Sequence, residues 1–214
     1  MLHQGIVIEY QAAEEGNDAL LFGPEAEYVR SLGSESRKGE FAAGRIAARR
    51  ALEQLGLQKG IAVPRSETGL PEWPKNIVGS ISHTRGLAVA AAAKSDAAAA
   101  LGVDIELSTR ALKGALERRV LSEEERKVIR GEGAGLLAFC AKEAVYKCLA
   151  SLGAPTFWFR EVTLKNMPPL GENPSQIDCE VTEGILKRCG LEKPPEVLIW
   201  WHKEFIVSLA RVYG

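Results

Sequence analysis

The segment Leu101-Gly102-Val103-Asp104-Ile105-Glu106-Leu107 alternates apolar and acidic side chains, which is typical of a β-strand. Because successive side chains on a strand point to opposite faces, its aliphatic residues share one face, and Asp104 and Glu106 share the other. Two carboxylates at positions i and i+2 can converge on one hard cation such as Mg²⁺. A solvated strand face is the alternative that this segment alone leaves open.

A third carboxylate lies in the segment Phe139-Cys140-Ala141-Lys142-Glu143-Ala144-Val145-Tyr146-Lys147. The pattern predicts a helix over residues 136–151, on which Glu143 and Lys147 are i, i+4 neighbours. An acid beside a lysine suits a metal-bound diphosphate, since the acid completes the metal shell and the ammonium meets phosphate oxygen. An ordinary surface ion pair is the alternative.

A serine and a histidine end the first of two predicted strands, 77–82 and 87–93, which are joined across residues 83–86. Ser82 and His83 do not form a convincing nucleophile pair, because adjacent residues rarely meet in attack geometry and the chain has no G-x-S-x-G elbow. Contact with a phosphate, or capping of the backbone, is the favoured role.

Several arginines occupy positions suited to binding an anion. A long helix predicted over residues 36–55 carries Arg45 and Arg49 four residues apart, and therefore on one face. Arg37 lies near its start, and Arg65 follows in the turn-rich segment 61–79. Guanidinium groups match phosphate geometry, although a solvated helix face would also account for them.

Composition limits the class of protein. The chain has 214 residues, with 27 basic and 28 acidic side chains, a net charge of −1, and 46% hydrophobic residues. This balance indicates a globular protein and argues against duplex-DNA binding. The longest apolar run, residues 87–93, is too short to span a bilayer, and no secretory signal is recognisable. The four cysteines form no CxxC pair, so we expect buried free thiols and a cytoplasmic protein.

Predicted strands occur in both halves of the chain, which indicates a mixed α/β (α+β) fold. Further strands are expected at residues 5–10, 162–164, 177–181, 197–202 and 205–212, and a capped helix at 122–130. The polar, alanine-padded stretch near residues 94–98 is the clearest candidate boundary, which gives two domains, 1–98 and 99–214.

In combination, these segments resemble a known family. Residues 102–106 fit G-[VI]-D-x-E, and residues 139–147 fit [FW]-[SCA]-x-K-E-[AS]-x-x-K, the paired signature of 4′-phosphopantetheinyl transferases. Residues 37–52, 69–74 and 79–83 resemble the N-terminal half of the siderophore-synthase (enterobactin-type) branch. The resemblance covers residues 30–165 well, and the last fifty residues only loosely.

The resemblance implies two similar α/β halves related by pseudo-twofold symmetry in a monomer, the 4′-phosphopantetheinyl transferase fold. The N-terminal half, residues 1–98, would contact the phosphates of coenzyme A, and the C-terminal half, residues 99–214, would carry the metal site and catalytic helix. The implied reaction transfers 4′-phosphopantetheine from coenzyme A to a serine of an apo acyl or peptidyl carrier protein. It requires Mg²⁺, or Mn²⁺ as a substitute, and releases 3′,5′-ADP.

The resemblance also assigns roles to residues. Asp104, Glu106 and Glu143 would hold the metal, and Glu143 would take the serine proton directly or through a metal-bound water. Lys147 would bind the diphosphate, which makes Glu143, Lys147 and Asp104 the expected catalytic residues. Further contacts with coenzyme A are expected from both halves. Lys142 would assist Lys147 at the diphosphate, and His83 with Ser82 would contact a phosphate of coenzyme A. Arg45 and Arg65 would bind the 3′-phosphate, and Arg37 and Arg49 are additional candidates for this contact.

Alternatives stay open at this point. A non-catalytic coenzyme A-binding module would keep the pocket without turnover, and a Mg²⁺-dependent phosphohydrolase would use the same acids without an acceptor. For carrier docking, we expect the exposed acids of residues 123–125 to repel an acidic carrier. Leu112, Leu116, Val120 and Leu121 are the preferred docking candidates.

Overall fold

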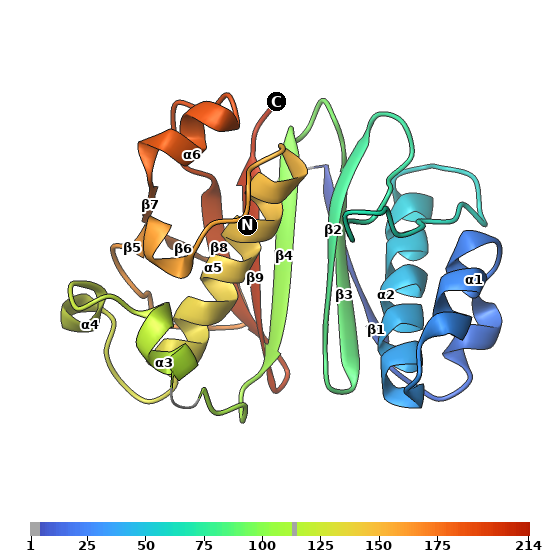
Figure 1. Ribbon diagram of the computed structural model, residues 1–214, viewed down its shortest axis with the longest axis horizontal. Coiled ribbons are helices and arrows are strands. Elements are labelled where there is room, and N and C mark those ends of the chain that lie inside the picture. Colours follow the sequence, from blue (N-terminus) through green and yellow to red (C-terminus); the bar gives the residue numbers. More distant parts are fainter. Residues whose placement is uncertain (1–4, 113–114) are drawn as a thin grey trace. The chain divides into compact units, whose positions relative to one another are not determined.

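The computed structural model describes residues 5–112 and 115–214, which form two compact units. Of the described residues, the N-terminal unit comprises 5–101 together with Tyr213 and Gly214, and the C-terminal unit lies within Gly102–Val212. Helices and strands occur in both, so the predicted mixed α+β class is confirmed (Figure 1). No helix among the described residues is long and apolar enough to cross a membrane.

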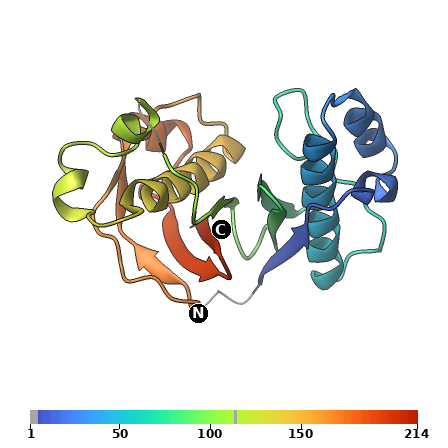
Figure 2. The ribbon, with the colours of Figure 1, turned by 90° about the horizontal axis from the view of Figure 1, so that it is seen from below.

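The N-terminal unit is built on an antiparallel sheet with the order β1-β3-β2. Helix α2 lies along one face of this sheet (Figures 1 and 2). Its buried face is rich in alanine, and so is the strand β3 beneath it, which lets helix and sheet approach closely. The elements are β1 (Ile6–Ala12), η1 (Asn17–Leu20), α1 (Pro24–Ser31), α2 (Glu35–Gln54), β2 (Ile77–Thr84) and β3 (Leu87–Lys94).

The C-terminal unit is built on a four-stranded sheet with the order β4-β9-β8-β6, beside a small β5-β7 sheet. The long helix α5 packs against β9 and β8 (Figures 1 and 2). The strands are β4 (Ala100–Leu107), β5 (Val162–Leu164), β6 (Ser175–Ile177), β7 (Cys179–Val181), β8 (Glu196–His202) and β9 (Phe205–Val212). The helices are α3 (Ala115–Val120), α4 (Glu125–Val128), α5 (Ala134–Ser151), η2 (Phe159–Glu161) and α6 (Glu183–Arg188).

Strand β4 touches α5 backbone to backbone at Gly102. A Cβ atom at this position would lie 2.0 Å from the carbonyl oxygen of Ala144 and 2.4 Å from the amide nitrogen of Cys148. Only glycine permits this approach. The contact brings the acidic end of β4 beside the middle of α5, where Glu143 and Lys147 lie.

The predicted elements, including the short strand over 162–164, are confirmed within two residues, with two exceptions. The helix expected over residues 122–130 is only the four-residue α4, although the reciprocal capping contacts of Ser122 and Glu125 are present. The strand expected over 177–181 is two strands, β6 and β7, interrupted at Asp178. Strand β4 is buried on both faces, so a solvated strand face is wrong for Asp104 and Glu106.

The cysteines are free thiols, as predicted. Cys140 and Cys148 are fully buried on α5, and Cys179 and Cys189 are partly buried. Burial raises the pKa of all four thiols, and that of Cys179 to about 12, so they remain protonated and unreactive at neutral pH.

Candidate active site

Asp104 and Lys147 join β4 to α5 in the C-terminal unit. The Lys147 Nζ lies 2.6 Å from Oδ1 of Asp104 and donates a further hydrogen bond of 3.2 Å to the Val103 carbonyl. Asp104 is buried, while a quarter of the Lys147 side chain is exposed. The ammonium therefore sits at the edge of the site, where it can also reach a bound anion.

Glu106 lies two residues further along β4 and pairs with Arg110. The guanidinium of Arg110 also stacks over the Phe139 ring, 4.9 Å from its centroid. Within the described part of the chain, the buried Oε2 of Glu106 has no hydrogen-bond partner. Burial is the main cause that raises the pKa of Glu106, and the charge of Asp104 adds to it.

Glu143 is half-buried on α5, one helical turn before Lys147. Its pKa is raised by burial first, and then by the charges of Asp104 and Glu106. The negative charges of the other two carboxylates thus disfavour ionisation of Glu143. Glu143 also lines a pocket of about 230 Å³, whose lining is half aromatic and includes Tyr146 and Phe157.

These acids have the chemistry of a divalent-cation site. Three carboxylates that repel one another, one with an orphaned buried oxygen, are the donors that Mg²⁺ prefers, so the residues fit such an ion. Across residues 5–112 and 115–214, no group of three or more potential ligands already surrounds one ion position. In this structure the carboxylates of Asp104 and Glu106 instead contact Lys147 and Arg110.

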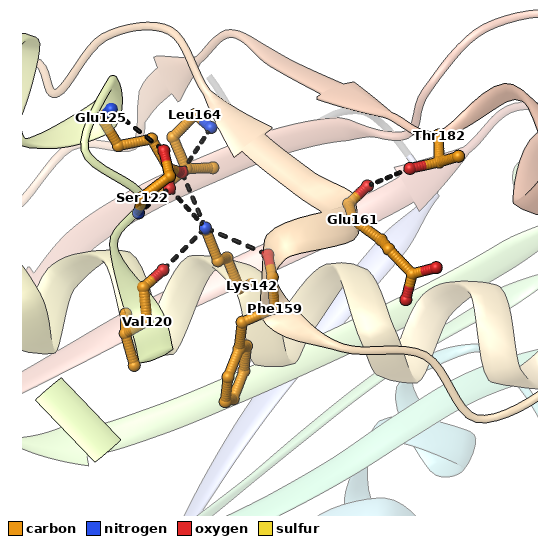
Figure 3. A network of polar contacts seen from close by, with 8 residues as sticks. All are labelled: Val120, Ser122, Glu125, Lys142, Phe159, Glu161, Leu164 and Thr182. Atoms are coloured by element: carbon orange, nitrogen blue, oxygen red, sulfur yellow. Dashed lines mark hydrogen bonds and ion pairs between the residues drawn. The ribbon is translucent and has the colours of Figure 1, made fainter. Parts of the chain in front are cut away.

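Lys142 is separated from this group although it adjoins Glu143 in sequence. It is 1% exposed, and its Nζ donates to the carbonyls of Val120 (2.8 Å) and Phe159 (3.1 Å) and pairs with Glu125 at 2.7 Å (Figure 3). An ammonium group has three donors, and these partners use them all. In this geometry the ammonium serves the buried network, while the side chain borders the pocket that Glu143 lines. Its contact with coenzyme A stays a prediction.

Glu125 completes this buried network. Its carboxylate accepts hydrogen bonds from the backbone amides of Ser122 (2.8 Å) and Leu164 (2.9 Å), as Figure 3 shows. Together with Lys142, it ties α5 to the segments that contain residues 120–125 and 159–164. The pair is a structural support for the loops around Glu143.

The N-terminal unit places Arg45 and Arg65 together. Arg45 is buried on α2, with its guanidinium 4.3 Å from the centroid of the Phe41 ring, and Arg65 lies 5.2 Å from that of Tyr28. The buried Nε of Arg45 lacks a hydrogen-bond partner among the described residues. Burial lowers the pKa of Arg45 to about 10, and the charge of Arg65 contributes in the same direction. Arg45 is still a cation at neutral pH and is prepared to receive an anion.

Arg49 has a different environment. Its Nη1 pairs with the fully buried Glu25 at 2.8 Å, and its Nη2 donates to the Leu20 carbonyl at 2.9 Å. Glu25 also accepts a 2.7 Å hydrogen bond from the Val63 amide. Arg49 and Glu25 thus hold α1, α2 and the loop before Arg65 together. A contact of Arg49 with coenzyme A stays a prediction.

The remaining predicted residues of this unit lie at the ends of elements. Ser82 is buried near the end of β2, and His83 beside it is exposed, with Nδ1 3.4 Å from a carboxylate oxygen of Glu40. Arg37 is exposed on the first turn of α2.

Sequence reasoning missed Glu25 and Arg110 and did not pair Glu125 with Lys142. Arg110 was detectable as a base four residues after Glu106. The capping pattern identified Glu125 only as a helix cap, and nothing local distinguishes Glu25 from a surface acid, because its partners lie 24 and 38 residues away.

Comparison with known proteins identifies the family. Residues 25–93 match the 4′-phosphopantetheinyl transferase N-terminal domain, and residues 100–188 match the 4′-phosphopantetheinyl transferase superfamily. The chain belongs to this superfamily, and the prediction that it is a 4′-phosphopantetheinyl transferase is confirmed.

Individual relatives narrow the assignment to the siderophore-associated type. The chain is 34% identical to 4′-phosphopantetheinyl transferase Svp of Streptomyces mobaraensis, over 80% of this chain and 72% of that one. It is 32% identical to enterobactin synthase component D of Salmonella typhi, over 77% and 70%. With 4′-phosphopantetheinyl transferase Npt of Nocardia iowensis, it shares 34% identity over 64% of this chain and 63% of that one.

Proposed function

We propose that this chain transfers 4′-phosphopantetheine from coenzyme A to a serine of an apo acyl or peptidyl carrier protein, with Mg²⁺, releasing 3′,5′-ADP. The observation that carries this proposal is the contact of β4 with α5 at Gly102. It places the Asp104–Lys147 pair between the strand that carries Glu106 and the helix that carries Glu143. Three acids and a lysine at one place suit a metal-bound diphosphate.

The reaction is attack by an alcohol on a diphosphate. The serine oxygen forms a bond to the phosphorus that carries pantetheine, the bond from that phosphorus to the bridging oxygen breaks, and 3′,5′-ADP leaves. Asp104, Glu106 and Glu143 would hold Mg²⁺, which when bound offsets negative charge on the diphosphate oxygens. Lys147 adds a second positive charge at this position, and positioning supplies much of the remaining acceleration.

Glu143 is the residue best placed to take the serine proton. It is half-buried at an aromatic-lined pocket, and its raised pKa makes it a stronger base than an exposed glutamate. Asp104 and Glu106 are paired with cations, so they are poorer candidates for this step.

The N-terminal unit supplies anion contacts in this proposal. Arg45 and Arg65 suit the 3′-phosphate, because Arg45 has an unused buried donor and Arg65 lies near it. Ser82, His83 and the exposed Arg37 are further candidates for phosphate contacts, while Arg49 positions its neighbours.

The proposal also covers how the chain is organised and where it acts. They are a division of labour between residues 1–98 and 99–214, pseudo-twofold symmetry of the two halves, a monomer, and a cytoplasmic location. The siderophore-associated relatives support a carrier protein of secondary metabolism as the acceptor.

The test is to measure release of 3′,5′-ADP from coenzyme A and Mg²⁺ with apo-carrier, with a carrier whose serine is replaced by alanine, and without carrier. We expect release only with the intact apo-carrier, and none after EDTA is added. Release without an acceptor would indicate a phosphohydrolase. Binding of coenzyme A without release on any carrier would indicate a non-catalytic binding module.

A further inference from the structure

Two arginines of the N-terminal unit are each stacked on an aromatic ring, and the two rings contact each other. Arg45, on α2, has its guanidinium carbon 4.3 Å from the centroid of the Phe41 ring. Arg65, in the loop between α2 and β2, has its guanidinium carbon 5.2 Å from that of Tyr28, on α1. The two ring centroids are 4.8 Å apart, with planes inclined by 50°. The four side chains therefore form one continuous row that links three segments of the chain.

The Arg65 guanidinium has a second contact, at Gly69. The loop turns tightly there: the Ser66 amide donates a 2.8 Å hydrogen bond to the Leu70 carbonyl, and the Gly69 amide donates one of 3.0 Å to the Ser66 carbonyl. Gly69 has a φ of +94°, and a Cβ atom at this position would lie 2.8 Å from an Nη atom of Arg65. The exposed Arg65 side chain is thus confined by Gly69 and by the Tyr28 ring.

Stacking on a ring holds an arginine differently from pairing with a carboxylate. A ring attracts the face of a guanidinium by about 0.5–2 kcal/mol and leaves the N–H donors in its plane available. Arg49 shows the contrast on the same helix, because Glu25 and the Leu20 carbonyl accept its hydrogen bonds. Arg45 instead keeps a buried Nε without a partner among the described residues. The rings therefore fix the two cations without neutralising them.

The two cations are also near enough to repel each other. Burial is the main cause of the lowered pKa of Arg45, the charge of Glu25 opposes it, and the charge of Arg65 lowers it further. The ring contacts offset part of this repulsion, and an anion that meets both guanidiniums would offset more. A phosphate monoester, which carries up to two negative charges, suits this pair of arginines.

We propose that Tyr28 and Gly69 position the Arg65 guanidinium for the 3′-phosphate of coenzyme A. They thereby make the chain select coenzyme A over dephospho-coenzyme A, which lacks this group. The inference rests on the proposed function, in which Arg45 and Arg65 bind the 3′-phosphate, and it names the residues that make this contact specific.

Tyr28 is the ring to test. Phe41 also packs against the hydrophobic cluster of Leu21, Val29 and Ala42, so its removal would not separate positioning from folding. Tyr28→Leu removes the stacking face and keeps apolar bulk, while Tyr28→Phe keeps the ring and is the matched control.

We expect Tyr28→Leu to raise KM for coenzyme A about fivefold or more, the effect of losing one cation–π contact. Its kcat and its KM for dephospho-coenzyme A should change less than about twofold, and Tyr28→Phe should resemble wild type. Equal rises for the two substrates would indicate a merely structural role and would overturn the inference. A normal KM for coenzyme A in Tyr28→Leu, or an equal rise in Tyr28→Phe, would also overturn it.

A residue that acts through Arg65 should have little effect once Arg65 is replaced. In the Arg65→Met background, adding Tyr28→Leu should raise KM for coenzyme A by less than about twofold. A loss as large as in the wild-type background would show that Tyr28 acts independently of Arg65, and the inference would fail.

Gly69→Ala and Gly60→Ala form a matched pair for the second contact. Both add a Cβ atom to a backbone of positive φ, +94° and +80°, so both carry a similar conformational strain. The Cβ atom at Gly69 meets the Arg65 guanidinium, whereas the one at Gly60 meets no atom within 4 Å. Gly69→Ala alone should therefore weaken binding of coenzyme A about fivefold or more. Equal affinities in the two variants would contradict the positioning role of Gly69.

Binding without turnover separates this inference from the proposed function. By calorimetry without a carrier, wild type should bind 3′,5′-ADP at least about tenfold more tightly than 5′-AMP, which lacks the 3′-phosphate. Tyr28→Leu should reduce this ratio about fivefold. Equal affinities in wild type would overturn the inference even if transfer occurs. Absence of transfer to any carrier, with the affinity ratio as expected, would refute the proposed transfer and leave the positioning of Arg65 supported.

Discussion

Arg45 is, at the scale of one residue, a buried cation that a bound anion would stabilise. Burying a guanidinium with an unsatisfied Nε is unfavourable for folding, and stacking on Phe41 offsets only part of that cost. Such a residue is expected where a bound anion supplies the missing interaction.

Replacing Arg45 with methionine should therefore separate stability from binding. The free energy of unfolding of Arg45→Met should stay within about 1 kcal/mol of wild type, because no buried partner loses its only contact. KM for coenzyme A should rise at least about tenfold, the effect of losing one charge-assisted contact. KM for dephospho-coenzyme A, which lacks the 3′-phosphate, should be nearly unchanged. An equal rise for both substrates would contradict this assignment of Arg45.

The sequence could predict the acids at this scale because their spacing is local. Asp104 and Glu106 follow the period of a strand, and Glu143 and Lys147 follow that of a helix. The role of Lys142 could not be predicted, because it depends on a carboxylate 17 residues away and on a carbonyl supplied by another loop.

At the scale of the element, the contact of β4 with α5 depends on Gly102. Gly102→Ala should lower the free energy of unfolding by about 3 kcal/mol or more, because its Cβ would overlap backbone atoms of α5. The acids would also move away from Glu143, so transfer should fall. The control is Gly184→Ala on α6, where the added Cβ meets no atom within 4 Å. Equal urea midpoints for G102A and G184A would contradict the close contact.

The Lys142–Glu125 pair also acts between elements. Lys142→Met leaves the Glu125 carboxylate buried without its cation and should lower the free energy of unfolding by about 3 kcal/mol. Adding Glu125→Gln should recover part of this loss, since the remaining side chain is neutral. Urea unfolding of both single variants and the double variant gives the coupling free energy between Lys142 and Glu125. Strictly additive losses would show that the pair is not a unit.

The thiols of Cys148, buried on α5, and Cys179, partly buried on β7, give the stability a pH dependence. Burial raises their pKa above the ordinary 9.0, so the folded state keeps protons that the unfolded state releases. Stability must then fall as pH rises above 9.0, by about 1 kcal/mol for each thiol between about pH 8 and about pH 10. The double variant C148A/C179A should show a flatter decline in urea unfolding over this range. A slope equal to wild type would contradict this cause.

The predictions of secondary structure were correct where the hydrophobic periodicity spans many residues, and wrong where a single residue interrupts a strand. The hydrophobic pattern located α2 and α5 because each covers four or more turns. Strands β6 and β7 were merged, because a break at Asp178 depends on its amide bonding to the side chain of Asn166 twelve residues earlier.

At the scale of the whole molecule, the chain carries an N-terminal domain and a C-terminal superfamily region in the order expected from the sequence blocks. In the proposed function each unit contributes one kind of chemistry, with anion contacts in the first and the acidic group in the second. Neither the anion contacts nor the acidic group identifies the carrier protein or its pathway, because all such carriers present the same acceptor serine.

The most direct test of the proposed transferase function is the intact mass of an apo-carrier after incubation with coenzyme A, Mg²⁺ and either wild type or Glu143→Gln. Wild type should add the mass of one phosphopantetheine, and EDTA should abolish the gain. Glu143→Gln should melt like wild type and transfer at least about 100-fold more slowly, as expected for loss of a general base. No mass gain with wild type on any carrier would contradict the transferase function, and full activity in Glu143→Gln would contradict the role of Glu143 in it.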